Sequence, residues 1–562
     1  MIKFLFKSRN LPKSSSRKIV LCLAVIFILA FFGTKALFHP GFYTSHDGWH
    51  QVARLYWFDQ ALRDGQYPPR LVNQLFYGFG YPLFTFSYHL PWWMAEPFLL
   101  IGFSVFDAIK AVFFLGFLLS GVFFFLWQRD LWGEEGGLAA AILYMWAPYH
   151  FSNIFVRAAL GEATGFIFLP LIFWSIAGRR EKFDFWPVLI GAIGIVGVFL
   201  SHAMLVYIFF LPLSLYFLIN FLVAKNRRVY LFSSFLTLIL GICLSSYYLL
   251  PALVFEPLTN FADLMQDFYQ GHFAPLSSLI YSKWSYGFSG NDLNRMSFQV
   301  GIAQWLALAL CFLIFMAVFL KRKKQERNFV LAQVFFLSFF FSIFMTTSAS
   351  SLIWHSLKRF PVVDFPWRYL SLAVFSGSVL SGFVISRFKG FGRHLFFFLF
   401  LLVAIYTNRN HIRVNQYTFI PLSTYVSSEA TTNLIDEYLP KWIERDEFRK
   451  IRKDESRLLA KSPEIKFSEP IIKTNSLEFS YKASREEKIT VNIIYFPDFK
   501  VFLDGKFYLM AREEGGVIKF LVPAGEHRVF VKYEDSWAGK LGNGLTVLGL
   551  GVCLVGLIRK KE

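Results

Sequence analysis

Charged residues are scarce in this chain of 562 residues. Asp, Glu, Lys and Arg make up 17% of it, whereas soluble domains average about 25%. Only four cysteines are present, all inside apolar stretches, which excludes a disulfide framework. The phosphate loop G-x-x-x-x-G-K-[ST], the zinc motif H-E-x-x-H and the nucleophile elbow G-x-S-x-G are also missing. The sequence therefore argues against ATP hydrolysis and zinc proteolysis.

Apolar residues are abundant instead. They reach 55% of the chain, with 71 Phe, and the mean hydropathy is +0.45. A soluble protein of this size could not hide that much apolar surface, so we predict a polytopic α-helical membrane protein. The net charge of +19 would suggest nucleic acid in a soluble protein. Here the basic residues form short clusters between apolar spans, so we expect no nucleic-acid partner.

About twelve membrane spans are expected. The first runs from Ile19 to about Phe38, behind a basic N-terminus at 1–18 that we place in the cytoplasm. The others lie near 106–127, 136–150, 163–178, 186–200, 203–223, 229–250, 301–320, 329–347, 369–386, 394–407 and 541–558. Counted from that start, the basic clusters at 179–182, 225–228, 321–324 and 387–393 and the tail 559–562 all fall inside. This pattern predicts a multi-pass protein of the cytoplasmic membrane with both termini cytoplasmic.

The polar chemistry is then concentrated on the outer side. Within a transmembrane domain at 19–407 we expect a first outer loop at 39–74, a re-entrant or interfacial segment at 75–105 and an outer loop at 251–300. Residues 408–464 form an outer helical connector, with a short helix suggested by TNLIDEYLPKWI (432–443). Residues 465–535 alternate apolar and polar between turn signals, which predicts an extracytoplasmic β-sandwich before the last span at 541–558.

A carboxylate and two imidazoles lie together at the start of the first outer loop: His46, Asp47 and His50. Such a group is unusual in so apolar a chain. Asp47 could serve as a general base or bind a hard cation. It could equally be the N-cap of the amphipathic helix expected at 49–64. The sequence leaves these alternatives open.

Ionisable residues also occur at the boundaries of later spans. Arg157 and Glu162 lie between two spans on the outer side, where charge is costly and usually functional or paired. They are either part of a site or an ion pair that ties two helix ends. His202 falls at another outer helix junction and is either a ligand or simply hydrogen-bonded.

Positive charge on the predicted outer stretch 348–368 runs against the topology. It comes from Lys358, Arg359 and Arg368. Binding an anion is one reason for such a placement, so Arg368 is a candidate for holding a phosphate. Trp367 could stack on a sugar or belong to the aromatic belt.

Several motifs together resemble a family of bacterial and archaeal membrane proteins. They include His46-Asp47, Gly65-Gln66-Tyr67-Pro68-Pro69-Arg70, Tyr77 to Phe84, Val156-Arg157 to Glu162, Leu200-Ser201-His202, Phe365-Pro366-Trp367-Arg368 and Glu437-Tyr438-Leu439-Pro440. The family carries the label "6-pyruvoyl-tetrahydropterin synthase-related" and is akin to YfhO-type proteins, whose C-terminal sandwich resembles YFPDFKVFLDGK and VPAGEHRVFVKY. The zinc-binding histidine cluster of the soluble pterin synthase is not visible in the sequence.

The resemblance implies the GT-C architecture of membrane glycosyltransferases, which take a sugar from a polyprenyl-phosphate carrier at the outer membrane face. It implies catalytic roles for Asp47 and Glu162, and substrate-binding roles for His46, Arg70, Arg157, His202, Trp367 and Arg368. A divalent cation, Mg²⁺ or Mn²⁺, would be held by Asp47 and Glu162 if one is used. The expected partners are membrane lipids, a polyprenyl-phosphate sugar donor and a glycan, lipid or protein acceptor.

Two other functions fit the same residues. A transporter or flippase for a lipid-linked sugar would use the arginines and a cavity but no base. A non-catalytic envelope-assembly protein would act through the β-sandwich. The lack of a matching second half, which many transporters have, favours the enzyme.

Overall fold

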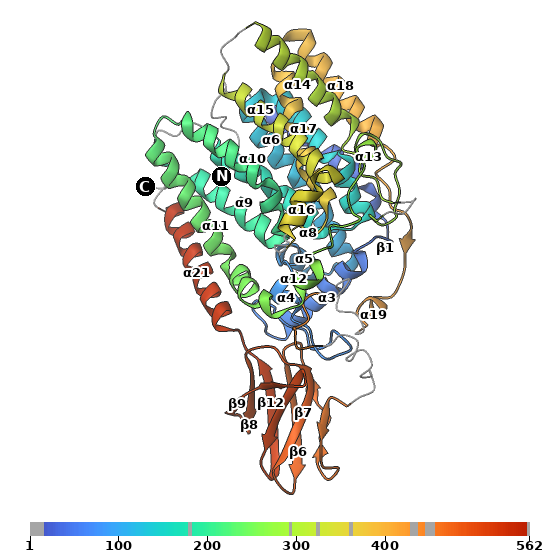
Figure 1. Cartoon of the computed structure of the whole chain (residues 1–562), viewed down its shortest axis with the longest axis vertical. Coiled ribbons are helices and arrows are strands. Elements are labelled where there is room, and N and C mark those ends of the chain that lie inside the picture. The colour runs from blue at the N-terminus through green and yellow to red at the C-terminus, as the bar shows by residue number, and fades with distance from the viewer. Residues whose placement is uncertain are drawn as a thin grey trace.

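The computed structural model describes residues 16–177, 182–290, 295–321, 326–358, 363–427, 436–443 and 456–558. The basic N-terminus up to residue 15, Arg359, the inner-loop clusters at 179–181 and 322–324 and the tail 559–562 lie outside the described residues. A bundle of helices forms the large part of the molecule, and a β-sheet domain projects from one end of it (Figure 1). The predicted fold class, a polytopic helical membrane protein with a C-terminal sheet domain, is confirmed.

Ten helices of the described chain are long and apolar enough to cross a membrane. They are α2 (Ser16–Gly33), α6 (Val105–Met145), α9 (Phe185–His202), α10 (Met204–Leu222), α11 (Arg227–Phe255), α14 (Ile302–Leu320), α15 (Arg327–Thr346), α17 (Leu370–Ser386) with the preceding turn η5 (Pro366–Tyr369), α18 (Gly390–Asn408) and α21 (Trp537–Ile558). The apolar helix α8 (Leu160–Ile176) is shorter. These helices coincide with the apolar segments of the sequence.

Helix α6 accounts for two of the predicted spans. Gly133 in its middle has φ +82° and ψ 176°, values outside the helical region. The two arms fold back on each other there and approach closely. A Cβ at Gly137 would lie 2.6 Å from the Arg129 backbone nitrogen, so this approach requires glycine. Likewise, a Cβ at Gly121 would meet the Met145 side chain. Glycines thus allow two apolar segments to pack as a hairpin.

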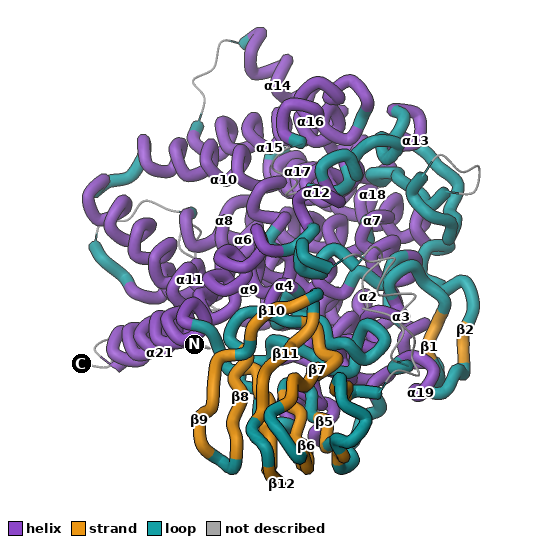
Figure 2. Tube along the Cα trace, turned by 60° about the horizontal axis from the view of Figure 1, so that its bottom comes forward, coloured by secondary structure: helices purple, strands orange, loops and turns teal. Residues whose placement is uncertain are grey.

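Short elements cap the end of the bundle that carries the sheet domain (Figure 2). They are η1 (Lys35–Phe38), β1 (Phe42–Tyr43), α3 (Gly48–Arg63), α4 (Leu83–Phe86), α5 (Leu90–Leu100), α7 (Pro148–Phe151), η2 (Ser152–Val156), η3 (Glu256–Leu258), α12 (Phe261–Met265), α13 (Leu276–Ile280), η4 (Ser348–Ser350), α16 (Ser351–Leu357), β2 (Tyr417–Thr418) and α19 (Leu422–Tyr425). Strand β1 of the first outer loop pairs antiparallel with β2 of the connector.

Two of the expected outer segments take a definite form. In segment 75–105 the longest helix is α5, with 11 residues, too short to cross a bilayer that needs about 20. The expected helix at 432–443 is wrong for its described part, because residues 436–443 form turns and a bridge from Pro440 to Thr259. Pro440 cannot donate a helical hydrogen bond, and the segment pairs with the outer loop instead.

The C-terminal domain contains two antiparallel sheets. One has the order β10 (Arg512–Glu514), β11 (Val517–Val522), β7 (Glu487–Ile494), β3 (Leu458–Ala460). The other has the order β4 (Lys466–Phe467), β6 (Ser476–Ala483), β12 (Gly525–Tyr533), β8 (Phe499–Leu503), β9 (Lys506–Met510), with β5 (Ile471–Ile472) also on β6. Alternate residues of both sheets, such as Phe479, Val491 and Val531, form one apolar core.

The first outer loop and the segment 75–105 that follows it form the contact surface for this domain. The Ile494 backbone nitrogen donates to the Phe79 carbonyl at 2.6 Å, and the Asn73 nitrogen donates to the Thr474 carbonyl at 2.8 Å. Beyond the last strand, α21 returns along α11 (Figure 1). A Cβ at Gly542 would lie 2.3 Å from the Ser246 carbonyl oxygen, so glycine permits this close approach. The domain is therefore held at both ends.

We predict that stability falls on acidification because of His411, which follows α18. Its ring stacks on Trp284 at 4.3 Å, and burial lowers its pKa from 6.5 to about 4. Since the unfolded chain binds a proton at higher pH than the folded one, stability is lost as pH falls below 6.5. The loss is about 2 kcal/mol at pH 5.

The measurement is the thermal midpoint in detergent at pH 7 and pH 5. His411→Gln should reduce the difference between the two midpoints. His355→Gln, which changes an exposed histidine of α16, should leave the difference as in the parent. An equal pH dependence in the His411 variant and the parent would contradict the assignment.

Candidate active site

A polar cavity of about 260 Å³ lies at the end of the bundle beside the outer loops. Seven of the eight predicted site residues line it: His46, Asp47, Arg157, Glu162, His202, Trp367 and Arg368. They come from four separate stretches of the chain. The fold therefore gathers the ionisable residues of the span boundaries into one place.

Backbone pairing docks the first outer loop onto the segment between α7 and α8. The His46 nitrogen donates to the Val156 carbonyl at 3.0 Å, and the Asp47 nitrogen donates to the Arg157 carbonyl at 2.8 Å. Ala158 has φ +53°, a left-handed value that is costly for a residue with a side chain. The π-helix η2 precedes it, and such irregular turns often mark functional sites.

Asp47 stands at the N-cap position of α3, but its side chain does not cap the helix. No hydrogen bond joins its carboxylate to the helix nitrogens. Among the described residues, that carboxylate has no hydrogen-bond or ion-pair partner, although it lines the cavity. The N-cap alternative is therefore wrong for the side chain, and the carboxylate can bind a ligand or accept a proton.

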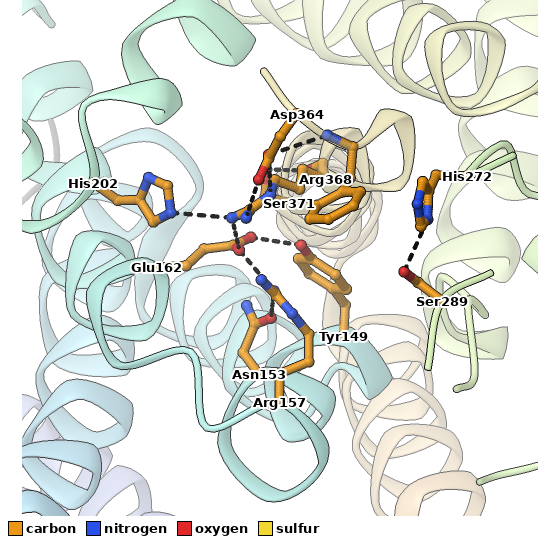
Figure 3. Close-up of polar contacts among 11 residues, drawn as sticks. Tyr149, Asn153, Arg157, Glu162, His202, His272, Ser289, Asp364, Arg368 and Ser371 are labelled. Atoms are coloured by element: carbon orange, nitrogen blue, oxygen red, sulfur yellow. Dashed lines mark hydrogen bonds and ion pairs between the residues drawn. The ribbon is translucent and has the colours of Figure 1, made fainter. Parts of the chain in front are cut away.

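Glu162, in contrast, is fully occupied by protein partners (Figure 3). Its Oε1 accepts from the Tyr149 hydroxyl at 2.5 Å. Its Oε2 accepts from Arg157 Nη1 at 2.8 Å and from Arg368 Nη1 at 3.2 Å. The side chain has no exposed surface. The sequence left two alternatives for Glu162, a residue of a site or an ion pair between helix ends. The structure shows both, because the ion pair lies in the wall of the cavity.

Arg368 is also largely engaged by protein partners. Its Nε and Nη2 lie 2.7 Å and 2.8 Å from the two oxygens of Asp364, and its Nη1 donates to Glu162 and to His202 Nε2. These contacts leave one N–H of Nη2 without a partner among the described residues, so Arg368 has fewer donors for a phosphate than a free guanidinium. The phosphate contact expected of Arg368 stays a prediction.

Arg157 keeps free donors. Its Nη1 binds Asn153 Oδ1 at 2.5 Å and Glu162, while its Nε and Nη2 have no partner among the described residues and remain accessible. Trp367 fixes the guanidinium, which lies 4.5 Å from the ring centroid. Only 2% of Trp367 is exposed. Trp367 therefore supports Arg157 in this structure, and its stacking on a sugar stays a prediction.

Arg70 does not line the cavity. It is buried at the contact surface for the C-terminal domain, where its Nε donates to Asp535 Oδ1 at 3.2 Å and its Nη2 donates to the Tyr247 carbonyl at 2.7 Å. We expected Arg70 to bind substrate, but the structure does not bring it to the cavity. Its contacts join the helical domain to the end of the sheet domain instead. The preceding Pro69 restricts the backbone at this position, but nothing in the local sequence indicated that Asp535 would be the partner of Arg70.

Two histidines of the first outer loop are neutral in the cavity wall. Burial lowers the pKa of His46, whose Nε2 donates to the Tyr286 carbonyl at 3.1 Å and whose ring stacks on Phe288 at 4.8 Å. Burial and the neighbouring Arg54 lower the pKa of His50 to about 4. His46 therefore holds the outer loop 251–300 over the cavity.

Sequence reasoning missed several residues that line the same cavity. Gln51, Arg54, Tyr88 and Glu437 are among them. Asp47, Gln51 and Arg54 recur at helical spacing, so a polar face on α3 was readable. Glu437 carried no local signal, because it comes from the connector and lies nearly four hundred residues from Asp47.

The donor set does not fit the suggested metal site. Glu162 has given its oxygens to Tyr149 and the arginines, so it cannot join Asp47 as a ligand. Within the described ranges, no three His, Cys, Asp or Glu side chains converge as a metal-binding group. We therefore derive no step through a metal ion.

We predict that Glu162→Gln destabilises the protein by about 3–5 kcal/mol, because it removes the negative charge between two buried arginines. Tyr149→Phe deletes one hydrogen bond to the same carboxylate and should cost about 1.5–3 kcal/mol. Thermal midpoints in detergent would rank the two variants. Parent-like stability of Glu162→Gln would show that the carboxylate does not balance the arginines.

No protein-family model matches the chain. An uncharacterized protein of Lactococcus lactis subsp. cremoris is 26% identical over 239 residues, which is 41% of this chain and 39% of that protein. The chain thus spans about two fifths of the length of the curated relative it matches. The family named from the motifs remains a prediction.

Two solved structures align with part of this chain. The mycobacterial arabinofuranosyltransferase AftD aligns with a TM-score of 0.44 and 14% identity, covering 74% of this chain and 28% of that one. ArnT from Cupriavidus metallidurans, bound to undecaprenyl phosphate, aligns with a TM-score of 0.42 and 13% identity, covering 73% and 68%. At such low identities and TM-scores the likenesses do not define the site, which its own geometry must explain.

Proposed function

We propose that this multi-pass membrane protein is an inverting glycosyltransferase of the GT-C type. It transfers a sugar from a polyprenyl-phosphate donor to a hydroxyl of an extracytoplasmic glycan, lipid or protein. One observation carries the proposal: two groups that lack partners within the described part of the chain, the Asp47 carboxylate and the Nε and Nη2 donors of Arg157, line the same cavity. These are the groups that such a reaction needs, a base and a cation for the leaving phosphate.

The reaction assigns one role to each group. The acceptor hydroxyl attacks the anomeric carbon on the face opposite the phosphate, and its proton passes to the Asp47 carboxylate. The bond between the anomeric carbon and the phosphate oxygen breaks, and polyprenyl phosphate leaves with its new charge beside Arg157. The transition state resembles an oxocarbenium ion, so the positions of base and cation govern the rate.

Glu162 has a positioning role in this scheme. Its carboxylate holds Nη1 of Arg157 and leaves the remaining donors of that guanidinium toward the cavity. Glu162 therefore acts on the donor only through Arg157. The catalytic role that the family resemblance implied passes to Asp47 alone.

The cavity also supports a membrane-bound donor. It lies at the helix ends of a bundle whose outer surface is apolar, with exposed residues such as Phe210, Leu253 and Leu352. A donor anchored in the bilayer can reach such a site without crossing water. No nucleotide-binding loop is needed for this chemistry, in agreement with the absence of one from the sequence.

We predict that Asp47→Asn lowers transfer by about 10²–10⁴-fold, because the amide cannot accept the proton. The measurement uses purified protein in proteoliposomes with a labelled polyprenyl-phospho-sugar and candidate acceptors. Asp59→Asn is the matched control, since Asp59 lies on the same helix, pairs with Arg63, accepts from Gln60 Nε2 and does not line the cavity. It should transfer at the parent rate.

The assay also separates the rival functions. Undiminished transfer by Asp47→Asn would refute the base assignment. Movement of labelled donor between leaflets without transfer, and equally in the Asp47 variant, would identify a flippase instead.

A further inference from the structure

His202 occupies a fixed place in the cavity wall. It ends helix α9, and its ring lies 6.2 Å from that of Tyr88. Its Nε2 is 3.0 Å from Arg368 Nη1 (Figure 3). Arg368 is itself held by Asp364 and Glu162, so the contact with His202 cannot shift freely.

This contact determines which ring nitrogen carries the proton. A guanidinium only donates hydrogen bonds and keeps its charge. The nitrogen that faces Arg368 must therefore offer its lone pair, and the imidazole is neutral with its proton on Nδ1. A second proton on Nε2 would place two cations against each other.

The Nδ1–H group remains available to a ligand. His202 lines the cavity, and its Nδ1 is accessible and has no partner among the described residues. Because Nε2 is engaged by Arg368, the ring cannot act as a general base. It can only donate.

A neutral donor suits the charge balance of this wall. Glu162 and Asp364 already offset Arg157 and Arg368, so the wall has no surplus positive charge for an anion with several charges. A phosphodiester carries one charge and oxygens that accept hydrogen bonds. The free donors of Arg157 and the Nδ1–H group of His202 lie in the wall of the same cavity and are of the type that binds such oxygens.

We propose that His202 is a substrate-binding residue whose Nδ1–H donates to a phosphodiester oxygen of the donor, and that Arg368 is the positioning residue that sets this tautomer. The inference rests on the proposed function. It divides the two arginines, which look alike in sequence, into one that contacts the phosphate and one that orients its neighbour.

The sharpest test incorporates Nδ1-methylhistidine at position 202. The methyl group removes the Nδ1 donor and leaves Nε2 free to accept from Arg368. We expect kcat/KM for the polyprenyl-phospho-sugar to fall about 10- to 100-fold, the loss of one hydrogen bond to a charged group. The thermal midpoint should stay near that of the parent. A parent-like kcat/KM would overturn the proposal.

Two further variants separate donation from structural support. In His202→Gln the amide oxygen can accept from Arg368 while the amide nitrogen donates into the cavity, so most of the activity should return. His202→Leu can do neither and should lose both activity and stability. Methylhistidine at His355, an exposed residue of α16, is the control for incorporation and should change nothing. Failure of His202→Gln to exceed the methylhistidine variant would count against a donor role.

A readout without catalysis keeps this inference distinct from the proposed function. Nitrogen-15 spectra of histidine-labelled protein, assigned by comparison with His202→Gln, should show an Nδ1–H, neutral imidazole for residue 202. An Nε2–H or doubly protonated ring would refute the tautomer. Binding of the polyprenyl-phospho-sugar without an acceptor, which is the phosphodiester itself, should weaken in the methylhistidine variant and persist in Asp47→Asn. If the parent binds this phosphodiester but transfers no sugar, the proposed function fails while this assignment stands.

Discussion

One buried carboxylate organises the functional end of the molecule. Glu162 begins an apolar helix and has no exposed surface, so its charge must be balanced by protein groups. Arg157 reaches it from the preceding turn, and Arg368 reaches it from a span two hundred residues later. Removing the carboxylate would leave Arg157 without its buried counter-charge and Arg368 with Asp364 as its remaining ion-pair partner, which is costlier than losing a single neutral hydrogen bond. The wall therefore forms as a unit.

The groups left over from this pairing define what the cavity can do. Arg368, Glu162 and Asp364 use most of their hydrogen-bonding groups in contacts with other side chains of the wall. The Asp47 carboxylate and the Nε and Nη2 donors of Arg157 make no such contact with the described residues. A base and a cation remain, each on a backbone segment tied to the other by hydrogen bonds at 46–47 and 156–157. The engaged residues hold geometry, and the others face the substrate. This division explains why residues with the same side chain have different roles.

Much of the fold was predictable because apolar length is a strong local signal. The spans follow from it directly. The strands of the sheet domain follow from the alternation of apolar and polar residues, and the candidates Asp47, Arg157 and Glu162 follow from their charge at the boundaries of spans. What sequence could not give is which partner each charge chooses. Arg70 resembles a site residue by its motif, yet it binds Asp535, which lies 465 positions away in the sequence. The partners of Arg368 could not be read in full for the same reason, because Glu162 and His202 are distant in the chain. Glu437 was invisible because connectors have no periodicity to mark an inward-facing residue.

The cavity draws its walls from positions as far apart as His46 and Glu437. A ribosome makes these stretches at different times, so the early charges emerge before their later neighbours exist. Arg157 and Glu162 can pair at once, being five residues apart, whereas Arg368 and the connector join only after most of the polypeptide has been made. The cavity around Asp47 is therefore incomplete until the stretches that contain Arg368 and Glu437 have been synthesised. The locally paired arginine and glutamate give the nascent bundle a neutral core onto which the remaining wall can later close.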